Sequence, residues 1–186
     1  MSPKIEKGTK GMKAIDFHGD LNEFLSAYNY QPELTKRLDD LQAFEFSQAL
    51  INEIVLWKLN RYVSIDKENL QKIEGMKHLR AGDHRQSKIV IESLLNIHGV
   101  DLPMASTLLR FRNPEVFQII DRHAYRAIYG RNYPLYQATP INRKVSVYFD
   151  YIDELINLCK SKKLPFQSID RILYIFDKHN NGRLKS

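Results

Sequence analysis

The feature that most constrains this chain is a pair of helical patterns joined by a very short turn. Apolar residues recur at helical spacing over residues 84–97 and again over 102–112, which predicts an amphipathic helix on each side. Gly99 ends the first pattern, because glycine tolerates the left-handed conformation found at helix ends. Asp101 is a typical helix cap, and Pro103 fits a first helical turn. The spacing therefore predicts two helices packed as a hairpin.

Similar periodicity and punctuation extend this prediction along the chain. Asp121 is expected to cap a helix over 122–129, and Asn113-Pro114 is a further cap-plus-proline signal. The helix over 45–60 is apolar around most of its circumference, which predicts a central, buried element that includes Trp57. Further helices are expected over residues 20–28, 32–41, 66–79, from Thr139-Pro140 to about 160, and 166–178. No strand alternation or repeat is visible, so the expected fold is an all-α helical bundle.

Charge and length define the expected domain organisation. The chain has 186 residues and a formal net charge of +6, and this length fits one domain. Residues 1–13 are expected to form a flexible basic arm and residues 179–186 a basic tail, with a single helical domain over 14–178. Residues 20–74 hold 6 basic and 10 acidic side chains, whereas residues 75–131 hold 9 and 5. The positive half contains the hairpin, which is consistent with a nucleic-acid partner.

Several classes of site and location are disfavoured by composition. The single cysteine, Cys159, cannot supply a disulfide framework, a structural zinc site or an iron–sulfur cluster. Its apolar surroundings predict a buried, inert thiol. The histidines show no metal-ligand spacing, so no cofactor or metal is expected. No apolar run approaches the length of a membrane span, and the N-terminus lacks an apolar signal region. We therefore expect a cytoplasmic protein that does not enter a membrane, with a monomer favoured.

The hairpin and the residues after it carry the chemical signal. A short turn followed by a helix N-terminus can aim backbone N–H groups at a phosphate. The second helix presents Arg110 and Arg112, which are expected to be exposed. The apolar run 117–120 then ends in Asp121.

These residues resemble the endonuclease III-like helix-hairpin-helix DNA glycosylases. That family's hairpin reads L-x-x-L-P-G-V-G-x-K-T-A, and its aspartate follows in a V-D-T-H-V-x-R context. Residues 94–105 here read LLNIHGVDLPMA, and residues 120–126 read IDRHAYR. The family's lysine falls at Pro103 and its aspartate at Asp121, and 121 − 103 = 18 is the family's own spacing. The resemblance covers residues 94–126.

The resemblance implies a DNA-glycosylase-like fold and a monofunctional DNA N-glycosylase. Such an enzyme hydrolyses the glycosidic bond of a damaged or modified base in duplex DNA, with Asp121 as the catalytic carboxylate. The hairpin would bind DNA, as part of base-excision repair. The implied DNA-binding residues are Gly99, Val100, Met104, Ala105, Arg110 and Arg112.

Three departures separate this chain from the family. Pro103 replaces the lysine that attacks the sugar in bifunctional members, so no Schiff base and no lyase step of that type is expected. Asp101 replaces the second hairpin glycine and places a carboxylate near the expected DNA phosphate. The cysteines that hold an iron–sulfur cluster in many members are absent.

Alternatives remain open for the main candidates. Asp121 can act as a helix cap, as a catalyst, or as both. A structural role is favoured for His123, and pairing with a core acid for Arg126. Residues 129–136 place three tyrosines in a loop that could stack on a base or pack on the body (Tyr129, Tyr133 and Tyr136). The alternative function is a non-catalytic helix-hairpin-helix module that binds DNA or a protein partner. A third reading is an unrelated activity on the same fold.

Overall fold

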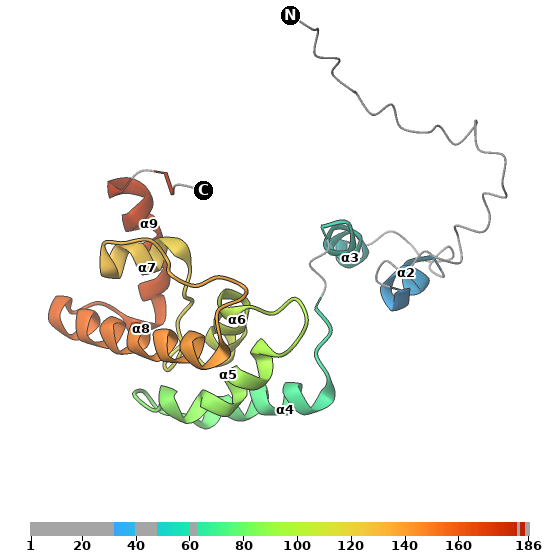
Figure 1. Cartoon of the computed structure of the whole chain (residues 1–186), viewed down its shortest axis with the longest axis horizontal. Helices are drawn as coiled ribbons and strands as arrows, with labels where there is room; N and C mark the ends of the chain where they lie inside the picture. The colour runs from blue at the N-terminus through green and yellow to red at the C-terminus, as the bar shows by residue number, and fades with distance from the viewer. Residues whose placement is uncertain (1–31, 40–47, 60–62, 182, 185–186) are drawn as a thin grey trace, which may run out of the picture. The chain divides into compact units, whose positions relative to one another are not determined.

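A computed structural model describes residues 32–39, 48–59, 63–181 and 183–184 (Figure 1). The chain divides into two compact units, Met1–Arg61 and Tyr62–Ser186. The expected basic arm over 1–13 and the helix expected over 20–28 lie outside the described residues. The expected single domain over 14–178 spans both units and stays a prediction.

The first unit contains α2 (Pro32–Asp39) and α3 (Gln48–Lys58), which contact each other. Trp57 Nε1 donates a hydrogen bond to Thr35 Oγ1 at 2.9 Å and so links the two helices. The prediction that the helix over 45–60, observed as α3, is central and well buried is wrong for its apolar side chains. Ile51, Val55 and Leu56 are 41%, 47% and 40% exposed. Among the described residues of this unit, the short helix α2 contacts α3, and one short helix covers only part of an apolar circumference.

The second unit is built from helices and short 3₁₀ turns. Their order is α4 (Lys67–Gly75), η2 (Met76–His78), η3 (His84–Ser87), α5 (Lys88–Leu95), α6 (Leu102–Arg112), α7 (Arg122–Tyr129), α8 (Ile141–Lys162), η4 (Phe166–Ser168) and α9 (Ile169–Asn180). The described residues include no strand, which confirms the all-α prediction. The helices expected over 102–112 and 122–129 have the predicted bounds. The one expected over 84–97 begins as a 3₁₀ turn and ends at Leu95.

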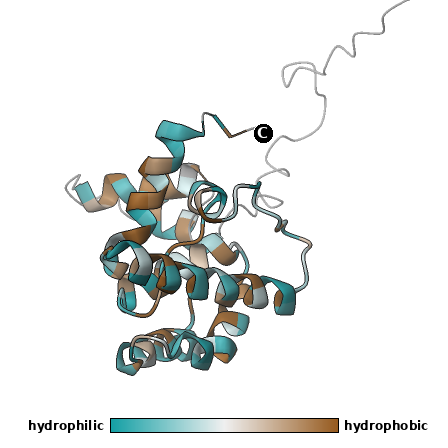
Figure 2. Cartoon of the chain, turned by 90° about the vertical axis from the view of Figure 1, so that its left-hand side faces the viewer, coloured by the Kyte–Doolittle hydropathy of each residue, from teal (hydrophilic) through white to brown (hydrophobic). Residues whose placement is uncertain are grey.

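The core of the second unit surrounds α8. This helix contacts α5 on one side and α7 on another, while α7 packs along α9 and α5 contacts α4 and α6 (Figure 1). Helices in Figure 2 carry hydrophobic and hydrophilic residues on different sides, as the periodicity requires. The fully buried side chains include Ile91, Leu94, Leu102, Leu109, Phe117, Ile120, Tyr148, Tyr151, Ile152, Leu155 and Ile169. Cys159 is also buried, as predicted.

Helix ends follow the expected chemistry at most positions. Gly99 has φ +82° and Gly130 has φ +64°, the left-handed region that glycine adopts readily. Asp101 and Asp121 cap α6 and α7. Asn113 differs from the prediction, because the residues after it form a turn rather than a helix. Its side-chain amide instead donates to the carbonyls of Met76 and Leu79, both at 3.0 Å.

Two further predictions meet the structure at this level. α9 extends to Asn180, which places the first residues of the expected tail over 179–186 inside a helix. Within the described residues, no helix combines the length and the apolar character needed to cross a membrane.

Candidate functional site

The turn between α5 and α6 is compact and internally bonded. The Val100 amide donates to the Ile97 carbonyl at 3.0 Å, and the positive φ of Gly99 reverses the chain. A Cβ on Gly99 would come no nearer than 3.7 Å to Val63 Cγ2, which is ordinary contact. Glycine is therefore favoured here by backbone conformation rather than by crowding.

Asp101, which replaces a glycine of the resembled family, is held by a buried lysine. Asp101 Oδ1 accepts hydrogen bonds from the Leu102 amide and from Lys144 Nζ, both at 2.7 Å. Lys144 is 6% exposed and also donates to the Gln137 carbonyl at 3.0 Å. The negative charge that the sequence places at the turn is therefore balanced from α8.

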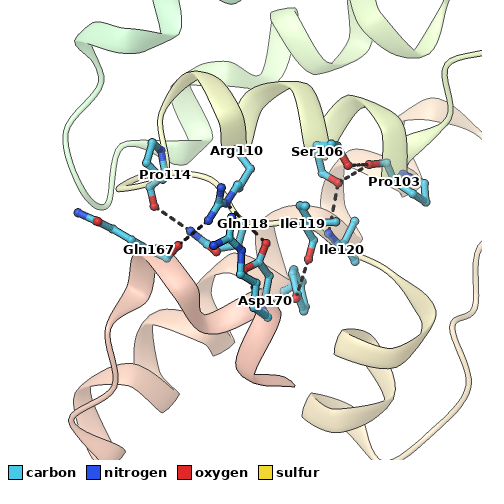
Figure 3. Close-up of polar contacts among 12 residues, drawn as sticks. Pro103, Ser106, Arg110, Pro114, Gln118, Ile119, Ile120, Gln167 and Asp170 are labelled. Atoms are coloured by element: carbon cyan, nitrogen blue, oxygen red, sulfur yellow. Dashed lines mark hydrogen bonds and ion pairs between the residues drawn. The ribbon is translucent and has the colours of Figure 1, made fainter. Parts of the chain in front are cut away.

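The extended segment before Asp121 is fixed by hydrogen bonds from buried side chains. Ser106 Oγ donates to the Pro103 carbonyl and accepts from the Ile120 amide at 3.2 Å (Figure 3). The hydroxyls of Tyr148 and Tyr151 donate to the carbonyls of Gln118 and Ile119, both at 3.0 Å. This segment therefore has a defined position between α6 and α8, and it delivers Asp121 to the start of α7.

Asp121 combines a helix cap with access to an open hollow. Its Oδ1 accepts a hydrogen bond from the Ala124 amide at 2.7 Å. The same side chain borders a hollow of about 350 Å³, near the lower end of the range typical of ligand pockets. The hollow is lined by Ile119, Asp121, Asp170, Arg171, Tyr174 and Ile175. Burial first, and then the nearby Asp121 carboxylate, raise the pKa of Tyr151 well above its usual value, so this phenol stays protonated.

A second carboxylate at the hollow is already paired. Asp170 is 5% exposed, and its Oδ2 lies 3.6 Å from Arg110 Nε. Arg110 also donates through Nη2 to the Gln167 carbonyl at 2.9 Å (Figure 3). The negative charge of Asp170 is therefore opposed by a buried guanidinium, whereas Asp121 has no cationic side chain paired with it among the described contacts.

The expected DNA contacts divide into two groups. Gly99 is exposed and Met104 is 38% exposed, whereas Val100 and Ala105 are buried. The amides of Val100 and Ala105 donate to the carbonyls of Ile97 and Asp101, so neither amide is available to a phosphate in this conformation. The expectation that Arg110 is exposed is wrong: it is 7% exposed and tied to α9, so its guanidinium is occupied within the domain.

Arg112, which was also expected to be exposed, is half-buried and has a partner. Arg112 Nε lies 3.0 Å from Glu74 Oε2, and its Nη2 donates to Glu74 Oε1 at 3.2 Å. A phosphate would therefore have to compete with Glu74 for this guanidinium.

Arg126 was expected to pair with an acidic side chain in the core, and that side chain is Asp177 on α9. Arg126 donates through Nε and Nη2 to the two oxygens of Asp177, both at 2.8 Å. His123 Nδ1 lies 2.6 Å from Asp177 Oδ2, and the Asn181 amide donates to Oδ1 at 2.8 Å. These hydrogen bonds, the Arg126 pair foremost, hold the pKa of the buried Asp177 carboxyl far below its usual value. The cluster joins α7 to α9, and structural roles for His123 and Arg126 follow.

The tyrosine loop packs mainly on the body of the protein. The rings of Tyr129 and Tyr133 lie 4.4 and 5.5 Å from that of Tyr125. Burial is the main cause that raises the pKa of Tyr129 to about 12. Tyr136, by contrast, is 74% exposed and remains available for stacking.

Sequence reasoning missed the contribution of α9 to the hollow. Asp170, Tyr174 and Ile175 line it, yet they follow Asp121 by about fifty residues and match no motif. The available signal was the position of Asp170 beside the apolar residues Ile169, Ile172 and Leu173 of an amphipathic helical pattern. Among the described residues, no cluster of histidine, cysteine and carboxylate side chains is placed to hold a metal ion.

Comparison with known proteins adds no relative. No family model, no curated protein and no solved structure matches this chain.

Proposed function

We propose that this protein is a monofunctional DNA N-glycosylase-like enzyme built on a helix-hairpin-helix core. The observation that supports this most directly is the position of Asp121 at the border of an open hollow of about 350 Å³. A carboxylate at a concave site, on a fixed backbone segment, is the arrangement that stabilises a developing positive charge. The resemblance over residues 94–126 supplies the choice of reaction.

The proposed reaction is hydrolysis of the bond between a sugar and a modified base. A nucleotide extruded from the duplex would enter the hollow, because a base inside the stack is out of reach. As the glycosidic bond lengthens, the sugar acquires oxocarbenium character, and Asp121 stabilises that charge or orients the attacking water. Water supplies the hydroxyl that replaces the base. Pro103 offers no amine, so the product is an intact abasic site.

DNA binding would use the turn between α5 and α6. Its exposed Gly99 permits close approach of a phosphate to the backbone and to the N-terminus of α6. The Asp101 carboxylate, which would otherwise repel a phosphate, is balanced by Lys144 at 2.7 Å. Lys144 therefore reduces the repulsion that the Asp101 carboxylate would exert on a DNA phosphate at this turn.

The test is base release from a panel of duplexes that each carry one modified base, measured for the wild type and for Asp121→Asn. Asparagine caps helices nearly as well as aspartate but lacks the charge. We expect nearly unchanged stability and a loss of roughly 10²–10³-fold in rate. Asp66→Asn is the matched control, because Asp66 caps α4 through the same bond, from the Asn69 amide at 2.7 Å. Borohydride should trap little covalent protein–DNA complex; efficient trapping would refute the monofunctional mechanism.

A non-catalytic helix-hairpin-helix module is the second candidate. It is favoured by one observation, the Asp121 hydrogen bond to Ala124, which by itself accounts for an aspartate at this position. If wild type and Asp121→Asn release no base from any duplex and differ only in unfolding midpoint, Asp121 is a cap. The binding module then replaces the enzyme as the proposed function.

A further inference from the structure

A second hollow, beside α7 and α9, is lined by basic side chains. Its volume is about 420 Å³, and its described lining residues are His123, Lys178, Arg183 and Leu184. They come from α7, from the last turn of α9 and from the segment after α9. Two cationic side chains, Lys178 and Arg183, thus share one concavity with a histidine from a distant part of the chain, and no carboxylate is among its described lining residues. We call it the basic hollow.

The nearest carboxylate does not cancel this positive charge. Asp177 precedes Lys178 in the chain, but its side chain is fully buried and paired with Arg126 through two hydrogen bonds. The charge of Asp177 is thereby balanced inside the domain. Lys178 and Arg183 remain on the outside with net positive potential, which favours an anion.

Asp177 also orients the histidine of the basic hollow. His123 Nδ1 lies 2.6 Å from Asp177 Oδ2, so the ring nitrogen that remains for a ligand is Nε2, on the opposite side of the imidazole. A histidine held through one nitrogen by a carboxylate presents the other in a fixed direction. The hydrogen bond to Asp177 therefore fixes the orientation of the His123 ring in the wall of the hollow.

The ring of Tyr174 connects the basic hollow with the hollow at Asp121. Tyr174 lines the Asp121 hollow, and its ring centroid lies 4.9 Å from that of His123. Lys178 Nζ lies 5.1 Å from the centroid of the same ring. The basic hollow and the carboxylate of the proposed reaction therefore both lie close to the same tyrosine, Tyr174.

We propose that the basic hollow binds a phosphate group of the DNA strand whose nucleotide occupies the Asp121 hollow. Arginine and lysine are the side chains that bind phosphate most effectively, by paired hydrogen bonds and by point charge. In DNA each sugar is joined directly to its flanking phosphates. A sugar at the Asp121 hollow would therefore bring a phosphate close to the adjacent basic hollow. The choice of DNA as the source of the phosphate rests on the proposed function; the affinity of the hollow for phosphate does not.

The experiment measures the salt dependence of binding to an unmodified duplex, which requires no base release. The double variant Lys178→Gln with Arg183→Gln is compared with Lys160→Gln with Lys162→Gln, which removes the same charge from exposed positions on α8. Loss of one phosphate contact lowers the slope of log affinity against log salt by about 0.9. We expect this change in the first double variant and none in the control.

Inorganic phosphate, followed by the NMR signals of the His123 imidazole, identifies the source of the anion. Shifts on addition of phosphate to the wild type, absent in the Lys178→Gln, Arg183→Gln variant, are expected together with the change in slope. Phosphate binding with an unchanged slope would show that the hollow takes a free phosphate compound and overturn the DNA assignment. No shift and no slope change would overturn the site, and would leave Lys178 as a cation that stabilises the C-terminal end of α9.

The outcomes also separate this inference from the proposed function. If the double variant changes the salt-dependence slope but the wild type releases no base from any substrate, the phosphate site is retained and the glycosylase is refuted. Base release that depends on Asp121, with slope and phosphate shifts unaffected by the double variant, would do the reverse.

Discussion

Replacing Asp177 by asparagine should destabilise the second unit more than any other single change of an acid to its amide. Asp177 is fully buried and accepts hydrogen bonds from Arg126, His123 and Asn181. The variant keeps the shape but removes the negative charge that Arg126 pairs with through two hydrogen bonds. Removing one partner of a buried ion pair costs about 3–5 kcal/mol in free energy of unfolding, which is a large part of the total for a domain of this size.

Urea denaturation at neutral pH measures this loss, and Asp150→Asn is the control. Asp150 is exposed and lies 3.9 Å from Arg85, so its variant should lose about 0–1 kcal/mol. The difference between wild type and Asp177→Asn should also depend on pH. The lowered pKa of Asp177 means that its stabilisation is complete above the unfolded pKa of about 3.9 and is lost as pH falls below it.

Two results would refute this reasoning. A loss for Asp177→Asn no larger than that for Asp150→Asn would show that the buried pair contributes little beyond its desolvation. A difference between wild type and Asp177→Asn that stays constant from pH 7 to pH 3 would show that the carboxylate charge is not the stabilising element.

Two other substitutions test the turn and a buried histidine. Gly99→Ala should cost about 1–2 kcal/mol in free energy of unfolding, measured by urea denaturation, because φ at this position is +82°. Gly75→Ala is the control and should be neutral or stabilising, because φ there is −59°. Equal effects of the two substitutions would contradict the backbone argument. His84 is 3% exposed, and burial, opposed by Asp153, lowers its pKa. The unfolded chain therefore binds a proton more readily, and stability should fall as pH drops below about 6.5; His84→Gln should flatten that part of the pH profile, and an unchanged profile would exclude His84 as its cause.

Sequence alone determined the local structure of the second unit. Apolar periodicity identified its helices, and Asp101 and Asp121 marked the starts of α6 and α7. Gly99 marked the turn between α5 and α6, although α5 itself ends earlier, at Leu95. These features depend on backbone conformation and on hydrogen bonds within a few residues, so they are written in neighbouring positions. The motif spacing also selected Asp121, which the structure places at an open hollow.

The partners of the charged residues were decided by tertiary structure alone. Arg110 was expected to be exposed, but α9 brings Asp170 against it and buries both. Lys144 had no assigned role until α8 placed it 2.7 Å from Asp101. The energy of a charge depends on its exposure to water and on the groups packed against it. Those groups come from residues more than forty positions away, a separation at which sequence spacing carries no information about contact.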